Sequence, residues 1–135
     1  MSKLDEKDFI YLSEFREYLE HGDSGKKSGL APKTIKRHVI NVIDFLYYAS
    51  THNYEVEIGG PDEVPVDDLL ITRGDEFFTL YFISWMSRCG YSEESAKQSI
   101  VSVKKFYKFL KETGRIDKNI ADAAIEDLSA TAFCL

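Results

Sequence analysis

The chain has 135 residues, of which 44% are hydrophobic and 30% charged, a balance typical of one globular domain rather than a disordered chain. Its net charge of −6, taken alone, argues against a nucleic-acid partner, and its only cysteines, Cys89 and Cys134, form no disulfide framework and no metal-ligand spacing. The sequence contains neither an apolar stretch of membrane-spanning length nor a signal peptide, so we expect a cytoplasmic protein without metal or cofactor.

The first half of the chain predicts two amphipathic helices joined by a basic loop. Apolar residues at helical spacing predict a first helix from about Glu6 to His21, with Gly22 ending it and the loop GDSGKKSG following. A second helix is expected to begin near Pro32, because proline is well tolerated in a first helical turn. Its apolar stripe covers about four turns and consists of Ile35, Val39, Val42, Leu46 and Ala49.

Residues 53–74 are the least regular segment, and we interpret them as a long acidic connector between two helical halves. A short strand pair is the alternative for this segment, and Asp67 or Asp68 is expected to cap a short turn through Leu70. The third helix is predicted from about Asp75 to Arg88. It is apolar nearly all round, so we expect it to be central and buried, with its aromatic residues in the core: Phe78, Tyr81, Phe82 and Trp85. Cys89, next along the chain, is expected to be partly buried.

The end of the chain predicts two further helices. Ser92 is a good N-cap for a fourth helix that runs to about Glu112, and a short fifth helix is expected from about Asp117 to Leu128, with residues 129–135 as a tail. The fold class is therefore all-α. We expect one domain over residues 1–135: a compact bundle of four main helices, arranged as two crossed helical hairpins, plus the short C-terminal helix.

The charges are distributed unevenly along the sequence. Residues 24–53 carry a charge of +4 and residues 92–115 carry +3, which leaves −13 for the remainder of a chain whose net charge is −6. The local electrostatic field decides where a polyanion binds. The two basic segments therefore favour a nucleic-acid partner despite the negative net charge.

The two basic helices also match each other at a constant offset of 61 residues when Thr34 is aligned with Ser95. Lys36 then pairs with Lys97, and the apolar positions coincide along both segments. Two amphipathic helices of any bundle would match in part, but the shared polar start followed by a lysine favours an internal repeat.

The order of these parts resembles a known family. LSEFREYLEH is followed by LAPKTIKRHVINVIDFLYYA, and later FFTLYFISWMSRCGYSEESAKQSIVSVKKFYKFLKETGRIDKN supplies a helix, a glycine, a serine-rich cap and a helix ending in Phe-Tyr-x-Phe-Leu. Over residues 9–121 this is similar to the N-terminal core-binding (SAM-like) domain of the tyrosine recombinase, or phage integrase, family. Three departures stand out: His38 replaces an aromatic residue, Ile120 rather than proline follows Asn119, and the 53–66 connector is longer and more acidic.

The resemblance implies a DNA-binding module that serves DNA integration or site-specific recombination. In the family this domain places its two basic helices against duplex DNA, and a separate domain holds the catalytic tyrosine with its arginine, lysine and histidine partners. Only a few residues follow Leu128, and no histidine begins an H-x-x-R motif, so we expect no enzymatic activity. The chain could be an excised domain, a truncated integrase or a stand-alone regulator.

The candidate DNA contacts are basic residues that share one side of each helix. The first turns of the second helix offer free backbone N–H groups beside their cations, and lysines along one side of the fourth helix can each neutralise a phosphate. A solvated lysine face is the alternative for either helix alone. The expected phosphate contacts are Lys33, Lys36, Arg37, Lys97, Lys104 and Lys108, and the peripheral ones are Lys26, Lys27, Lys105 and Lys111. We expect weak affinity for double-stranded DNA.

A rival hypothesis is a protein–protein interaction or dimerisation domain with no DNA binding. The acidic remainder of the chain and an apolar C-terminal segment would suit a second copy or a recombinase partner. That segment contains Ala130, Ala132, Phe133 and Leu135.

Overall fold

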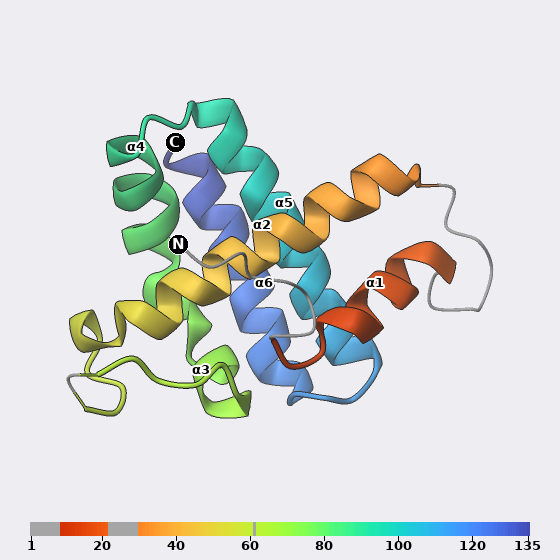
Figure 1. Ribbon diagram of the computed structural model, residues 1–135, viewed down its shortest axis with the longest axis horizontal. Helices are drawn as coiled ribbons and strands as arrows, with labels where there is room; N and C mark the ends of the chain where they lie inside the picture. The colour runs from red at the N-terminus through yellow and green to blue at the C-terminus, as the bar shows by residue number, and fades with distance from the viewer. Residues whose placement is uncertain (1–8, 22–29, 61) are drawn as a thin grey trace.

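The computed structural model describes residues 9–21, 30–60 and 62–135 (Figure 1). Every regular element in this part of the chain is helical, which confirms the predicted all-α fold. The elements are α1 (Leu12–His21), α2 (Pro32–Thr51), η2 (Asn53–Glu55), α3 (Asp68–Thr72), η3 (Gly74–Phe77), η4 (Thr79–Trp85), α4 (Met86–Arg88), α5 (Glu93–Glu112) and α6 (Lys118–Phe133).

The two long helices α2 and α5 cross at the centre of the molecule (Figure 1). α1 packs against α2 to form the first hairpin, and η4 packs against α5 to form the second. α6 lies along α5, with which it shares the most extensive helix–helix contact of the described chain. The core between the hairpins is aromatic: Phe15 contacts Phe106 edge to face, and Phe45 stacks on Phe82 with ring centroids 5.5 Å apart. These ring contacts fix how the two hairpins are docked.

The ends of the helices differ from the prediction in two places. α1 begins at Leu12 rather than near Glu6, because Tyr11 has a φ of 70° that interrupts a right-handed helix; residues before 9 lie outside the described chain. α6 continues past Leu128 to Phe133, and its Thr131 is buried. The predicted tail is therefore largely helix, extending a helix that starts where the Asp117 carboxylate accepts N–H bonds from Asn119 and Ile120.

The third predicted helix is a composite. Its start, η3, is a 3₁₀ helix, η4 is a π-helix, and only α4 has α-helical hydrogen bonding. The expected burial holds for Phe78, Tyr81 and Phe82, whereas Trp85 is only partly buried. Cys89 at the end of α4 is exposed rather than partly buried, which corrects the expectation for it.

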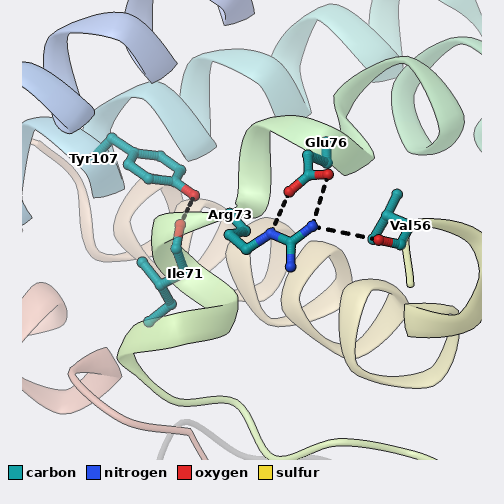
Figure 2. Close-up of polar contacts among 5 residues, drawn as sticks. All are labelled: Val56, Ile71, Arg73, Glu76 and Tyr107. Atoms are coloured by element: carbon teal, nitrogen blue, oxygen red, sulfur yellow. Dashed lines mark hydrogen bonds and ion pairs between the residues drawn. The ribbon is translucent and has the colours of Figure 1, made fainter. Parts of the chain in front are cut away.

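The connector is irregular, but specific hydrogen bonds hold it in place. Its described residues between 53 and 74 contain no strand pair. The Asp67 side chain accepts an N–H bond from Leu70 at 3.1 Å, which confirms the predicted cap and starts α3. Beyond it, the Arg73 guanidinium contacts the Glu76 carboxylate and the Val56 carbonyl (Figure 2).

The end of the connector is also tied directly to α5. The Tyr107 hydroxyl donates to the Ile71 carbonyl at 2.6 Å (Figure 2). Gly74 lies directly beneath that hydroxyl, because a Cβ atom there would be 2.1 Å from it. The close approach between η3 and α5 therefore depends on the missing side chain at position 74.

Candidate nucleic-acid interface

The start of α2 is exposed and basic. Ala31, the residue before the helix, is extended and provides no side-chain cap, and the first turn contains no acidic residue. Lys33, Lys36 and Arg37 are all exposed. The first backbone N–H groups of a helix have no intrahelical partner, so this end offers both free donors and positive charge to an anion.

The outer side of α5 is the second basic surface. No acidic residue occurs between Ser95 and Lys111. Lys97 and Lys108 are exposed, and Lys104 and Lys105 are half-buried. The start of α5 is built conventionally, because the Ser92 hydroxyl accepts an N–H bond from Ser95 at 3.1 Å. Its cations lie along the body of the helix instead of its first turn.

A small polar cluster joins the two basic helices at their crossing. Asn41 Nδ2 of α2 donates to Ser102 Oγ of α5 at 3.0 Å, and His38 Nδ1 lies 2.7 Å from the same oxygen. Burial lowers the pKa of His38 below its usual value, and the positive charges of Lys105 and Arg37 lower it further. Positive charges from both helices therefore act on the His38 side chain at the crossing.

The match between α2 and α5 at an offset of 61 residues extends to their burial pattern. Asn41 and Ser102, which contact each other at the crossing, are themselves 61 residues apart. Most matched positions share the same degree of burial, with Val39, Val42 and Phe45 buried like their equivalents in α5. From Thr34 of α2 and Ser95 of α5 onward, four matched pairs are exposed in both helices: Lys36 and Lys97, Arg37 and Gln98, Ile40 and Val101, and Tyr47 and Lys108. The two helices therefore share a burial pattern as well as a sequence pattern.

The remaining predicted contacts are placed differently. Lys26 and Lys27 lie outside the described residues. The Lys111 ammonium is 2.7 Å from the Asp122 carboxylate of α6, so it forms part of the α5–α6 contact, and we leave it out of the interface. Arg115 has a similar structural role, since its guanidinium lies over the Tyr11 and Phe109 rings.

Sequence reasoning missed the residues at the crossing itself. The contacts of His38 and Asn41 with Ser102 join segments more than 60 residues apart, and only Asn41 is the residue that the offset of 61 matches to Ser102. Exposed Ile40 and Val101 were also missed, although both stand outside the apolar stripes of their helices. Among the described residues no group of three His, Cys, Asp or Glu side chains is placed to hold a metal ion.

No family model matches the chain, and neither a curated protein nor a solved structure matches it. None of the helices in the described part of the chain is both long and apolar enough to cross a membrane.

Proposed function

We propose that the chain is a DNA-binding module, resembling the core-binding domain of tyrosine recombinases, whose α2 and α5 contact the backbone of duplex DNA. Its role is in DNA integration or site-specific recombination, without catalysing strand transfer itself. The observation that carries the proposal is the meeting of two basic helices: His38 and Asn41 of α2 both contact Ser102 of α5. The exposed cations of this helix pair are Lys33, Lys36, Arg37, Lys97 and Lys108.

Local charge, not net charge, favours DNA binding. Positive charge gathers on one pair of helices in a chain that is otherwise strongly acidic, so a polyanion would be attracted to that pair and repelled elsewhere. Each lysine that neutralises a phosphate releases a counterion, which makes binding strongly salt-dependent. The acidic remainder opposes binding, so we expect weak affinity that is detectable only at low salt.

Charge reversal tests the proposal. Lys36→Glu combined with Lys108→Glu removes one exposed cation from each helix, and binding to duplex DNA in a low-salt gel shift should fall below detection. Milder single changes, Lys36→Gln and Lys108→Gln, should each flatten the log–log salt dependence by about one unit. A matched control, Arg88→Glu with Lys118→Glu, makes the same change in net charge at exposed sites outside the interface and should retain most of the binding.

Two results would contradict the proposal. One is the absence of duplex binding by the unchanged chain at about 50 mM salt, where electrostatic contacts are strong. The other is an equal loss of binding in the interface and control variants, because net charge alone would then explain it. A covalent protein–DNA adduct formed by the pure chain would overturn the statement that it does not catalyse strand transfer.

A second candidate function, association with another protein, is favoured by one observation: the Phe133 side chain is 93% exposed at the end of α6. Its neighbours Ala132 and Leu135 are partly buried against the core, so the apolar segment as a whole is not free. Sedimentation of Phe133→Asp against the unchanged chain tests this function. A shift from dimer to monomer would support it, and identical behaviour would remove its main support.

A further inference from the structure

A small hollow opens beside the crossing of α2 and α5, where both helices meet the segment formed by η4 and α4. Its volume of about 160 Å³ corresponds to roughly five water molecules. Each surrounding element contributes polar side chains to the lining: Arg37 and Asp44 come from α2, Tyr81 from η4 and Ser99 from α5. The hollow is therefore a polar site rather than an apolar gap in the packing.

Two of these side chains are buried and carry hydroxyl groups without a partner. Tyr81 is 5% exposed and Ser99 is 4% exposed, and neither hydroxyl forms a hydrogen bond with another residue of the described chain. Among the described residues only Asn53 Oδ1, outside the hollow, is a fully enclosed side-chain polar atom that lacks a partner, so both hydroxyls open onto the hollow. Buried polar groups are nearly always hydrogen-bonded. These two hydroxyls therefore require a partner that occupies the hollow.

Opposite charges line the hollow as well, but they are not paired. Arg37 and Asp44 lie about two turns apart on α2, roughly 10.5 Å along the axis, and neither forms an ion pair with a described residue. Although part of the Asp44 side chain is exposed, desolvation by the surrounding protein raises the pKa of its carboxyl group, and no positive charge of the described chain offsets this effect. The hollow thus holds a carboxylate and a guanidinium that each lack a counter-charge.

Core packing and backbone geometry hold the Tyr81 hydroxyl in place. The Tyr81 ring contacts Phe45 edge to face and packs on Tyr48, with centroids 5.5 and 5.1 Å away. Tyr81 also lies in η4, whose π-helical backbone is of a rare kind that is frequent at functional sites. Burial raises the pKa of Tyr81 and the charge of Asp44 raises it further, so the phenol keeps its proton beside that carboxylate. A ligand would therefore meet a preorganised hydroxyl.

We propose that this hollow binds a small zwitterion that carries a primary ammonium group and a carboxylate, as the smallest α-amino acids do. The ammonium group donates its N–H groups to the Asp44 carboxylate and to the hydroxyls of Tyr81 and Ser99. The ligand carboxylate pairs with the Arg37 guanidinium, which is suited to bidentate contact. Each unpaired group of the hollow then has a partner, and the volume limits the ligand to about the size of glycine or alanine. The proposal does not rest on DNA binding, although Arg37 would serve in both.

Titration of the isotope-labelled chain with glycine, followed by NMR chemical shifts, tests the site. Glycine should cause saturable shifts centred on the amides of three residues that line the hollow, Tyr81, Tyr91 and Ser99. Methylamine lacks the carboxylate and acetate lacks the ammonium group, so each should bind at least about tenfold more weakly, which corresponds to losing one charged hydrogen-bonded pair. Asp44→Asn keeps the shape of the side chain and should weaken glycine binding by a similar factor. Tyr81→Phe should weaken it about fivefold, because it removes one neutral acceptor.

Asp62→Asn is the matched control, because it removes the same charge from an exposed site outside the hollow and should keep full glycine binding. Absence of saturable shifts with glycine would show that the hollow holds water alone and would overturn the proposal. Equal binding of glycine and methylamine would also overturn it, since the carboxylate would then play no part, and so would equal losses in Asp44→Asn and Asp62→Asn. No DNA is present in the titration, so each of these results leaves the proposed function unaffected, and a failed gel shift leaves this site unaffected.

Discussion

α2 and α5 share a burial pattern but begin in opposite ways. α5 starts with a capping serine, Ser92, and two acidic residues in its first turn, which the helix dipole favours. α2 starts after Ala31 with no side-chain cap, and Lys33 stands where the dipole disfavours a cation. The comparison teaches that the start of α2 is not optimised for helix stability, whereas that of α5 is. A bound phosphate would accept hydrogen bonds from the uncapped N–H groups at the start of α2.

The helices also differ in what their matched core positions contact. Leu46 of α2 corresponds to Tyr107 of α5, and both are buried. Only Tyr107 carries a hydroxyl. That group donates to the Ile71 carbonyl of α3 and occupies the space that a side chain at Gly74 of η3 would fill. α5 is thus joined to the connector by a hydrogen bond that Leu46, the matched residue of α2, cannot make.

The largest expected effect breaks that anchor. Gly74→Ala would place a methyl group 2.1 Å from the Tyr107 hydroxyl, so we expect the free energy of unfolding to fall by about 2 kcal/mol or more. Adding Tyr107→Phe removes the hydroxyl and should restore part of that loss, although Tyr107→Phe alone destabilises. Gly60→Ala is the matched control, since nothing lies within 4 Å of its added Cβ. Equal losses for Gly60→Ala and Gly74→Ala in urea unfolding would refute the packing argument.

A smaller effect comes from exchanging the helix starts. Ser92→Ala should destabilise the chain by about 1 kcal/mol, because it removes the cap of α5. Ala31→Asp should stabilise it by a similar or smaller amount, because Ala31 already has the extended backbone of a cap residue. The same Ala31→Asp change adds negative charge beside Lys33 and should weaken DNA binding. Improved stability together with improved binding would contradict the division of roles between the two helix starts.

The smallest expected effect is on the pH dependence of stability. It comes from His38, whose matched residue in α5 is Ser99. The pKa of His38 is lowered in the folded chain by burial and by Lys105 and Arg37, so the unfolded chain takes up this proton more readily. The stability contributed by the neutral ring is therefore present above pH 6.5 and is lost as pH falls through the lowered pKa. His38→Gln should reduce the loss of stability between pH 7 and pH 5. An unchanged or steeper loss in thermal unfolding would assign the acid sensitivity to other groups.

Local signals in the sequence predicted much of the fold. Pro32 and Ser92 fixed the starts of α2 and α5 because helix starts depend on nearby residues. The composite third helix had no such signal, since an apolar run does not reveal which hydrogen-bonding pattern its backbone adopts. Likewise the extension of α6 to Phe133, within which Thr131 is buried, depends on tertiary packing that a sequence of small residues does not reveal.

The candidate site divides in the same way. Lys36 and Lys97 could be placed on exposed sides from helical periodicity alone. The ion pair of Lys111 with Asp122 could not be predicted in this way, because it depends on how α6 docks against α5. The contact of His38 with Ser102 is tertiary and joins residues 64 apart, so no local signal in the sequence predicts it.

The hydrogen bonds that hold the connector determine where the chain can be lengthened. Asn53 Nδ2 donates to the carbonyls of Ile58 and Gly60 at 2.7 and 2.9 Å, which closes a compact loop after α2. Further along, the Val64 amide donates to the Ser50 carbonyl and so returns the chain to the end of α2. Between these two hydrogen-bonded points, where Asp62 and Glu63 are exposed, the chain can therefore gain residues without shifting the register of either helical half. Doubling such a loop costs only about 0.6 kcal/mol, so insertions and reporter peptides are best placed there.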